Sequence, residues 1–244
     1  MEGEGMKKDR GSDFFDFLRE EVDFPFLDRT PIISESFHNA ALSPEEMDFY
    51  WSQGWRHFGP LFVRYSYSSE NHHLQVVQPL RVSLDRFTLS RSHRRVLRRN
   101  TDLEVRIKPT VIDAERAQLF DRHKGRFESN VPVSLDDFLG SFPSRCPCEN
   151  IELGAYLDGR LVAASYLDLG REGVSSVYAM FCPSQEWRSL GIATMLWEMN
   201  LARERGSRFY YPGYAFHEPS RLDYKKQFRG LEWYNWRGRW LPLE

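Results

Sequence analysis

Cysteine is scarce in this chain, which has three cysteines among 244 residues. So few cysteines, one of them necessarily unpaired, exclude the disulfide framework of a small secreted domain. No run of 18 apolar residues occurs, so we expect no membrane-spanning helix. The stretch Met1–Arg10 has no apolar segment, so we expect no signal peptide. These absences predict a soluble, cytoplasmic protein that has no membrane partner.

Net charge is also nearly absent, because 33 Lys and Arg stand against 35 Asp and Glu. Aromatic residues make up 15% of the chain and hydrophobic residues 41%, which excludes an intrinsically disordered protein. The length allows one large or two smaller domains. We predict an N-terminal α+β region over residues 1–109 and a second domain over residues 110–244, packed as one body because no Gly/Ser-rich or Pro-rich linker separates them.

Arginine is concentrated in one segment of the chain. The segment 81–99 contains seven arginines, no lysine and the single acid Asp85. Its arginines are Arg81, Arg86, Arg91, Arg94, Arg95, Arg98 and Arg99. Arginine has a planar guanidinium that can form two hydrogen bonds to one phosphate, so a segment rich in arginine and without lysine suits phosphate binding. A charged helix face in contact with solvent is the alternative. We call residues 86–100 the Arg-rich segment.

The apolar pattern predicts a mixed α/β (α+β) protein. Ser43-Pro44 begins a helix that passes Trp55, and residues 61–67 and 74–82 form a strand pair. The Asp158-Gly159 turn predicts a hairpin. The other expected helices are 90–100, 112–127, 134–142, 188–205 and 221–228, and the other strands are 101–109, 151–157, 161–169, 174–181, 208–211, 231–236 and 239–243.

This order of elements in the second half resembles an acyltransferase domain of the GNAT type. The segment Arg188-Ser-Leu-Gly191-Ile-Ala193 is similar to the pyrophosphate loop of that fold. A glycine lets the backbone approach a phosphate, and the first N–H groups of a helix point at the anion. A glycine needed only for helix–strand packing is the alternative explanation.

A more specific resemblance extends over residues 81–240. Arg91-Ser-His-Arg-Arg95 with Arg98-Arg-Asn100-Thr-Asp-Leu, and Tyr211-Pro-Gly-Tyr214 followed by Tyr224-Lys225, are similar to segments of the arginyl- and leucyl-tRNA–protein transferases. The resemblance implies a GNAT-type fold, with a possible degraded GNAT-like half at the N-terminus. It also implies transfer of an aminoacyl group from tRNA to an N-terminal α-amine, the N-degron reaction.

The resemblance implies partners and site residues as well. The partners are the tRNA acceptor arm and a protein or peptide N-terminus, and aminoacyl-tRNA is a co-substrate, so we expect no cofactor. Asp168 and Tyr178 are the candidate catalytic residues, although Asp168 and Lys225 can also be read as a structural ion pair. The candidates for tRNA, substrate or phosphate binding are Arg91, Arg94, Arg95, Arg98, Asn100, Arg188, Gly191, Ala193, Tyr211, Gly213, Tyr214, Tyr224 and Lys225.

The chain departs from this family in its cysteines. The family carries an N-terminal cysteine cluster for a metal or iron–sulfur centre, and residues 20–80 here contain no cysteine. Cys146 and Cys148 supply at most two ligands, so we predict no metal. Two alternatives therefore stay open. One is an N-acyltransferase that uses acetyl-CoA or another acyl-CoA, which Ala193 favours, and the other is a catalytically silent tRNA-binding relative.

Overall fold

The computed structural model describes residues 30–70, 73–127 and 131–243, and Ile32–Glu244 forms one compact unit. A three-stranded antiparallel sheet has the order β1-β3-β2. Its strands are β1 (Ser34–His38), β2 (Arg56–Phe58) and β3 (Leu61–Tyr65). The first 29 residues of the predicted N-terminal region lie outside the described residues.

A nine-stranded sheet is the centre of this unit. Its order is β12-β11-β5-β10-β9-β8-β7-β6, and β4 pairs with β5. The strands are β4 (Tyr67–Glu70), β5 (His73–Ser83), β6 (Glu104–Pro109), β7 (Asn150–Leu157), β8 (Arg160–Leu169), β9 (Gly173–Phe181), β10 (Phe209–Phe216), β11 (Leu231–Tyr234) and β12 (Trp240–Pro242). Strands from both sides of residue 109 share this sheet, so the predicted boundary falls within it.

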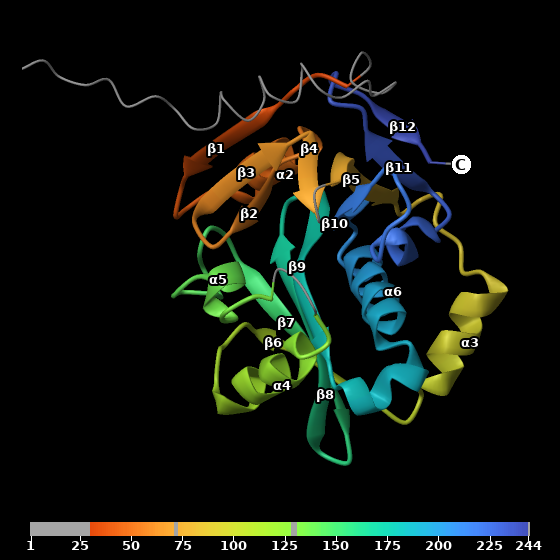
Figure 1. Cartoon of the computed structure of the whole chain (residues 1–244). Coiled ribbons are helices and arrows are strands. Elements are labelled where there is room, and N and C mark those ends of the chain that lie inside the picture. Colours follow the sequence, from red (N-terminus) through yellow and green to blue (C-terminus); the bar gives the residue numbers. More distant parts are fainter. Residues whose placement is uncertain (1–29, 71–72, 128–130, 244) are drawn as a thin grey trace, which may run out of the picture. The chain divides into compact units, whose positions relative to one another are not determined.

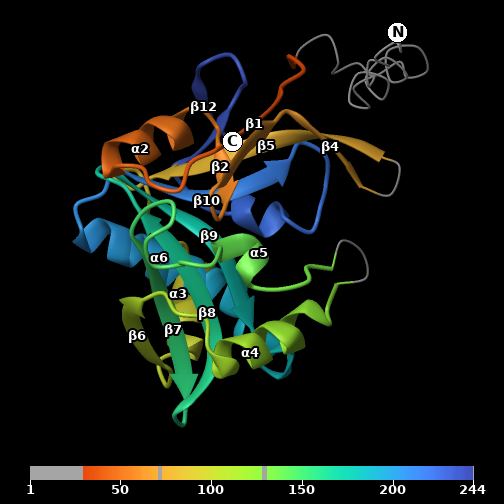
Figure 2. The same ribbon diagram turned by 90° about the vertical axis from the view of Figure 1, so that its left-hand side faces the viewer.

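Helices cover both faces of the sheet, with α4 on one side of β7 and β8 and with α6 and α3 on the other (Figure 1, Figure 2). The α-helices are α2 (Pro44–Ser52), α3 (Arg91–Arg99), α4 (Ala114–Lys124), α5 (Asp136–Leu139) and α6 (Leu190–Glu204). Two short 3-10 helices are η1 (Pro183–Arg188) and η2 (Asp223–Lys226). None of the helices in the described ranges has the length and apolar character needed to cross a membrane.

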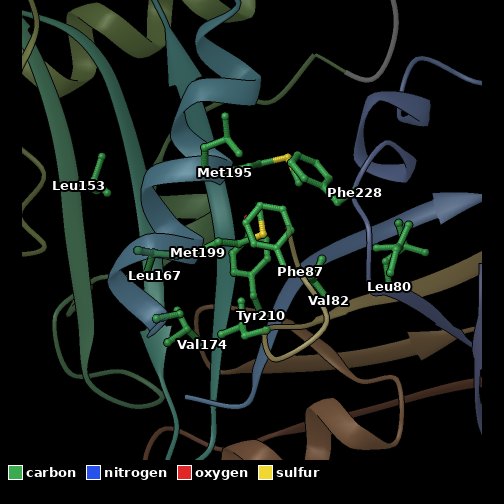
Figure 3. Packing of buried hydrophobic residues seen from close by; sticks show 14 of the residues in the cluster. Leu80, Val82, Phe87, Leu153, Leu167, Val174, Met195, Met199, Tyr210 and Phe228 are labelled. Carbon is green, nitrogen blue, oxygen red and sulfur yellow. The ribbon is translucent and has the colours of Figure 1, made fainter. Parts of the chain in front are cut away.

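The two faces of β8 separate two hydrophobic clusters, because neighbouring side chains of a strand point to opposite faces. Leu167 packs with Met195 and Met199 of α6 and with Tyr210 of β10 (Figure 3). Tyr166 belongs to the cluster around α4 on the other face. The sheet is therefore buried on both sides, as an α/β architecture requires.

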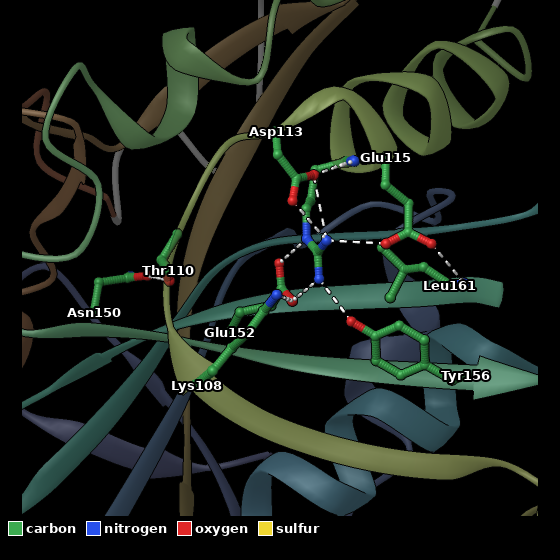
Figure 4. A network of polar contacts seen from close by, with 9 residues as sticks. Lys108, Thr110, Asp113, Glu115, Asn150, Glu152, Tyr156 and Leu161 are labelled. Carbon is green, nitrogen blue, oxygen red and sulfur yellow. Dashed lines mark hydrogen bonds and ion pairs between the residues drawn. The ribbon is translucent and has the colours of Figure 1, made fainter. Parts of the chain in front are cut away.

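A buried ion-pair network fastens α4 to β7 (Figure 4). The Arg116 guanidinium donates to both carboxylate oxygens of Glu152, at 2.9 and 2.8 Å, and to the Tyr156 hydroxyl at 2.7 Å. Glu152 is fully buried, and Asp113 and Glu115 also accept from Arg116. A buried charge is tolerated when it is paired and hydrogen-bonded, so this network holds the helix in one position.

Two local predictions are confirmed by the element ends. Ser43 begins α2 and caps it with a capping box, and the structure shows that Ser90 caps α3 in the same way. Asp158 and Gly159 have φ values of 50° and 77°, the positive values that a tight hairpin turn between β7 and β8 requires.

Other boundaries were predicted wrongly. The expected pair of 61–67 with 74–82 does not form, because β3 pairs with β1 and β2, and only β4 pairs with β5. Between β3 and β4, Ser66 is fully buried and its backbone N–H donates to Ile33. The helix α2 ends before Trp55, because Gly54 has a φ of +81°. Finally, η2 is a four-residue 3-10 helix in place of the longer helix expected over 221–228.

The junction of β9 and β10 is the place where two neighbouring strands of the sheet part. These two strands are parallel, but they pair only from Gly173 to Ser175 with Phe209 to Tyr211. Beyond a register shift between Tyr210 and Gly213, β10 continues against β5. The strands therefore separate, and α6 packs beside the point of separation (Figure 1).

Candidate active site

The separation of β9 from β10 opens the sheet between two of its central strands. Gly173, Val174 and Ser175 are buried, whereas the next four residues, 176–179, are partly exposed. Arg56 from β2, Glu198 from α6 and Lys225 from η2 come together at this opening. We call Arg56, Glu198 and Lys225 the charged cluster. Its members come from three distant parts of the sequence, so only the fold brings them together.

Arg56 reaches the cluster from the three-stranded sheet. Its guanidinium donates to the Ser175 hydroxyl at 2.6 Å and to the backbone carbonyl of Ser176. The residue keeps part of its surface exposed, although surrounding protein lowers the pKa of the guanidinium by desolvation. A guanidinium has five N–H donors, so Arg56 retains donors for a ligand after these two bonds.

Lys225 lies against the backbone of β10. Its Nζ donates to the Tyr214 carbonyl at 3.1 Å. A Cβ added at Gly213, which has a φ of +97°, would lie 3.4 Å from this Nζ and 3.5 Å from Nη2 of Arg56. Desolvation, together with the charge of Arg56, lowers the pKa of Lys225 to about 7, and Glu198 opposes this shift. The residue as a whole keeps part of its surface exposed.

Glu198 is the acidic member of the cluster and is fully buried. Its carboxylate accepts a hydrogen bond from the Tyr210 hydroxyl. Burial raises the pKa of this carboxyl, and the neighbouring hydroxyls of Tyr210, Ser165 and Ser176 oppose the increase. Because no surface of Glu198 is open, we infer that this carboxylate positions the groups around it and does not touch a substrate.

The exposed arginines of α3 form a second functional surface. Arg91, Arg94, Arg95 and Arg98 are all exposed, and their spacing of three and four places them on one helix face. Within the described part of the chain, no carboxylate pairs with these four, and Arg94 donates only to the Leu89 carbonyl. We call these four residues the arginine face. On the inner side of the helix, His93 stacks on Phe228 at 4.9 Å.

Two other arginines of this segment have structural partners instead. Arg81 and Arg86 both pair with Glu232 on β11. Arg81 also lies over the rings of Phe209 and Trp240, at 4.1 and 4.4 Å from their centroids. Arg99 donates to the Trp187 carbonyl and the Ser189 hydroxyl, so the seven arginines seen in the sequence divide into a structural group of three and an exposed group of four.

The start of α6 combines an open glycine with a buried arginine. Only Phe181, at 3.7 Å, would touch a Cβ at Gly191, so packing does not require glycine there. Arg188, by contrast, donates to both oxygens of Asp102 at 2.8 Å and is 5% exposed. Ala193 is fully buried.

Asn100 joins the end of α3 to this same segment. Its side-chain amide donates to the Arg188 carbonyl at 3.0 Å and to the Val96 carbonyl at 2.9 Å, and the residue is buried. Asn100 and Arg188 thus connect the two helices, and their phosphate-binding roles stay predictions.

The four tyrosines that the sequence singled out lie in different places. Tyr224 is 37% exposed beside the charged cluster, and burial raises its pKa to about 12. The hydroxyl of Tyr214 donates to the Gly54 carbonyl at 2.6 Å. Tyr211 lies in a separate cluster with Trp51 and Trp240. The fourth, Tyr178, is described with Asp168 below.

The two candidate catalytic residues are not members of the charged cluster, although the charge of Asp168 acts on Arg56 and opposes the lowering of its pKa. Asp168 is 1% exposed, lies 2.5 Å from the Nε2 of His57 and accepts from Asn150 at 2.8 Å. Tyr178 stacks on Phe138 of α5, with ring centroids 4.1 Å apart. Neither forms a hydrogen bond or ion pair with Lys225 among the described residues, so their catalytic roles stay predictions.

Metal-ligating side chains are not grouped in the described ranges, where no three His, Cys, Asp or Glu residues lie close enough to hold an ion. The three cysteines are free thiols, and burial raises the pKa of Cys148 well above its ordinary value. The residues present therefore do not fit the N-terminal cysteine centre that the family resemblance implies.

Sequence reasoning missed Arg56 and Glu198. Arg56 lies in Gly54-Trp-Arg-His-Phe-Gly59, a segment with only a faint family resemblance. The signal for Glu198 was stronger, because it is an acid within the apolar face of the helix that contains Leu196 and Met199. An acid at a core position needs a buried partner, and here that partner is Tyr210.

Comparison with known proteins gives consistent results. A family model described as "Arginine-tRNA-protein transferase, C terminus" matches residues 115–235. The aspartate/glutamate leucyltransferase of Alkalilimnicola ehrlichii is 32% identical over 231 residues, which cover 91% of this chain and 93% of that protein. The corresponding protein of Marinobacter nauticus is 33% identical over 159 residues, which cover 63% of this chain and 66% of that protein, slightly less than two thirds of its length.

Two solved structures show a weaker similarity. L-PGS from Bacillus licheniformis matches with a TM-score of 0.44 and 16% identity, over 77% of this chain and 54% of that one. FemX matches with a TM-score of 0.46 and 10% identity, over 72% of this chain and 61% of that one.

Proposed function

This chain belongs to the arginyl- and leucyl-tRNA–protein transferase family, and on that basis we propose that it transfers an aminoacyl group from tRNA to the α-amine of a protein or peptide. In this reaction the amine attacks the ester carbonyl, an amide C–N bond forms, and the C–O bond to the terminal ribose breaks. The ribose hydroxyl leaves and recovers a proton. The protein must therefore bind a polyanion, accept a proton from an ammonium group and hold both substrates together.

The observation that carries this proposal is the position of Lys225. The residue is partly exposed, its amine lies against β10 beyond the point where that strand separates from β9, and its lowered pKa, about 7, allows it to be neutral near physiological pH. A general base works best when its pKa is close to the operating pH. Lys225 then removes the proton of the incoming ammonium, and Glu198, which is enclosed, stabilises the lysine after protonation.

Arg56 provides a fixed positive charge beside Lys225. Its two known bonds leave further N–H donors available, and a guanidinium is well suited to a carboxylate. We propose that Arg56 binds the side chain of an acidic N-terminal residue on the acceptor, so that the reaction creates an N-degron on such proteins.

The arginine face supplies the surface for tRNA. Phosphate contacts position a nucleic acid without reading its sequence, and four exposed arginines without acidic partners among the described residues fit that role. The tRNA acceptor arm is the polyanion, and aminoacyl-tRNA is the co-substrate, so we propose that no cofactor or metal takes part. Charged tRNA and nascent or cleaved proteins meet in the cytoplasm, which we propose as the location of the reaction.

The experiment is a transfer assay with a total pool of tRNA charged with radiolabelled amino acids. Acceptor peptides differ only in their first residue, and acetyl-CoA is offered in parallel as a competing donor. We expect label to move from one charged tRNA species to acidic N-termini, with Lys225→Met inactive. Arg160 is the exposed first residue of β8, and we expect Arg160→Ala to be fully active. Transfer from acetyl-CoA alone would contradict the proposal, and tRNA binding without transfer would indicate a silent tRNA-binding protein.

An acyl-CoA-dependent N-acyltransferase is the second candidate, and the open backbone at Gly191 favours it. Among the residues that the structure describes, only Phe181, at 3.7 Å, would touch a Cβ at Gly191, so the glycine leaves room for a phosphate at the start of α6. Under this alternative, Gly191→Ala weakens CoA binding with little change in stability, and Gly191→Glu abolishes it. Unchanged CoA affinity in both variants would exclude this alternative.

A further inference from the structure

Trp187 is a large aromatic side chain held at the surface, 56% exposed on η1. The Arg188 guanidinium lies 4.5 Å from the centroid of its ring. Arg188 is itself fixed by two bonds to Asp102. The indole is therefore supported by an immobilised cation while more than half of the residue remains in contact with solvent.

The backbone around Trp187 is fastened to the end of the Arg-rich helix. Arg99, the last residue of α3, donates to the carbonyl of Trp187 and to the hydroxyl of Ser189, the latter at 3.3 Å. Asn100 donates to the Arg188 carbonyl at 3.0 Å. These bonds place Trp187 at the C-terminal end of α3, whose exposed side is the arginine face, while α6 begins at Leu190 (Figure 1).

A single exposed apolar residue needs no explanation in general, but this one has two features that match a known type of binding surface. Its ring is oriented by neighbours that are themselves fixed, and it lies beside arginines that lack acidic partners among the described residues. Surfaces that bind single-stranded nucleic acid combine positive charge along the backbone with aromatic rings on which bases stack. A flat ring with low mobility loses little entropy when a base stacks on it.

We propose that Trp187 is a stacking platform for an unpaired base of the tRNA acceptor end, while the arginine face holds the adjoining phosphates. This inference rests on the proposed tRNA-dependent function. The rise along α6 from Leu190 to Glu198 is about 12 Å at 1.5 Å per residue. That rise matches about four stacked nucleotides at 3.4 Å each. In this arrangement an unpaired 3′ strand that starts at Trp187 runs along α6 towards the charged cluster.

The test measures binding of the full chain to two RNA hairpins that share one acceptor-stem sequence. One hairpin ends in an unpaired 3′ segment, and the other is blunt. We expect Trp187→Ala to weaken binding of the hairpin with the unpaired end about tenfold or more and to leave binding of the blunt hairpin unchanged. We also expect Trp187→Phe to retain most of the affinity, because a phenyl ring still stacks, and Trp187→Leu to behave like the alanine variant.

Phe49 provides the matched control, since it is 60% exposed on α2 and lies away from the Arg-rich segment in sequence. Phe49→Ala is expected to bind both hairpins as the parent protein does. The salt dependence of binding should be the same in Trp187→Ala as in the parent, because stacking neutralises no phosphate.

Two results would overturn the stacking proposal while the tRNA proposal stands. In the first, Trp187→Ala weakens binding of both hairpins equally. In the second, this variant keeps the full affinity of the parent for the hairpin with the unpaired end. If Trp187→Leu and Trp187→Phe bind the hairpin with the unpaired end equally well, then Trp187 makes a general apolar contact and does not stack on a base. If the parent protein binds neither hairpin, the tRNA-dependent function fails, and the stacking proposal fails with it.

Discussion

The Nζ of Lys225 lies 3.4 Å from the place that a Cβ at Gly213 would occupy. Gly213 has a φ of +97°, and it follows the register shift at which β10 leaves β9. Positive φ favours glycine because it has no Cβ to clash with the backbone. This glycine therefore serves two purposes, since it allows the irregularity in the pairing of β10 with β5 and leaves room for the lysine amine.

Gly213→Ala should lower the transfer rate more than it lowers stability. The new methyl group presses on Lys225 and Arg56, and a displacement of about 1 Å at a reacting group can cost about 100-fold in rate. We expect at least a tenfold loss of kcat, measured with charged tRNA in excess. Gly159→Ala is the matched control, because its φ is +77° but nothing lies within 4 Å of its Cβ position. If the two variants are destabilised to a similar degree and Gly159→Ala also loses activity, then Gly213 has no special role in leaving room for Lys225.

The pH dependence of transfer follows from the lowered pKa of Lys225. If its neutral amine accepts the proton, kcat rises tenfold per pH unit below about 7 and becomes constant above it. The measurement is single-turnover transfer between pH 5.5 and 8.5, with preformed enzyme–tRNA complex so that binding does not limit the rate. Lys225→Arg, which stays protonated throughout, should be inactive across this range. A profile that is flat through pH 7 in the parent would show that another group accepts the proton.

Lys225→Met should be more stable than the parent at low pH. The pKa of Lys225 falls from 10.5 to about 7 on folding, so the unfolded chain binds more protons between these values and the lysine opposes folding most strongly below about pH 7. The variant should therefore melt at a higher temperature at pH 6, by about 2–4 °C for each kcal/mol removed. The difference should shrink as the pH approaches 9. A lower melting temperature of the variant at pH 6 would mean that the bond to the Tyr214 carbonyl outweighs the cost of burying the charge.

The arginine face should set the salt dependence of tRNA binding. Replacing Arg91, Arg95 and Arg98 by alanine should reduce the slope of log K against log salt by about one for each phosphate that the variant no longer binds. We expect binding to all tRNA species to weaken to a similar degree, because phosphate contacts carry no sequence information. Filter binding at several salt concentrations measures this slope, with Arg160→Ala as the control. An unchanged slope in the triple variant would make the arginine face an ordinary solvated helix surface.

The local parts of the fold could be predicted because their signals are local. Ser43 three residues before Glu46, and Asp158-Gly159 between apolar runs, determine a helix start and a hairpin turn through bonds within a few residues. The pairing of β3 could not be predicted in this way. Its apolar pattern fits several partners, and the choice depends on the buried Ser66, whose partner Ile33 lies far away in the sequence.

The candidate site was predictable only in part for the same reason. Gly213, Tyr224 and Lys225 stood out through the family resemblance, and the structure places them together. Arg56 and Glu198 complete the cluster from segments that carry no strong motif, so their roles depend on tertiary contacts. The sequence also could not divide the arginines, since Arg81 and Arg91 look equivalent until Glu232 is found beside Arg81.

The pairing of Arg188 with Asp102 leads to the last prediction, which distinguishes a structural arginine from a phosphate ligand. Arg188 donates to Gln185, to the Arg99 carbonyl and to both oxygens of Asp102. Its side chain is 6% exposed, so few of its donors remain for an anion. Arg188→Ala should lower the free energy of unfolding by about 2–3 kcal/mol, and Asp102→Ala should also destabilise, because it leaves a buried cation without its partner.

A double-mutant cycle of these two positions checks the argument, because residues in contact show a coupling that distant residues lack. The double variant should be less destabilised than the sum of the single variants. Urea unfolding of all four proteins measures this coupling, and hairpin binding is followed in parallel. If Arg188→Ala keeps the stability of the parent but loses affinity for RNA, then Arg188 is a phosphate ligand, and the junction of α3 with α6 does not depend on it.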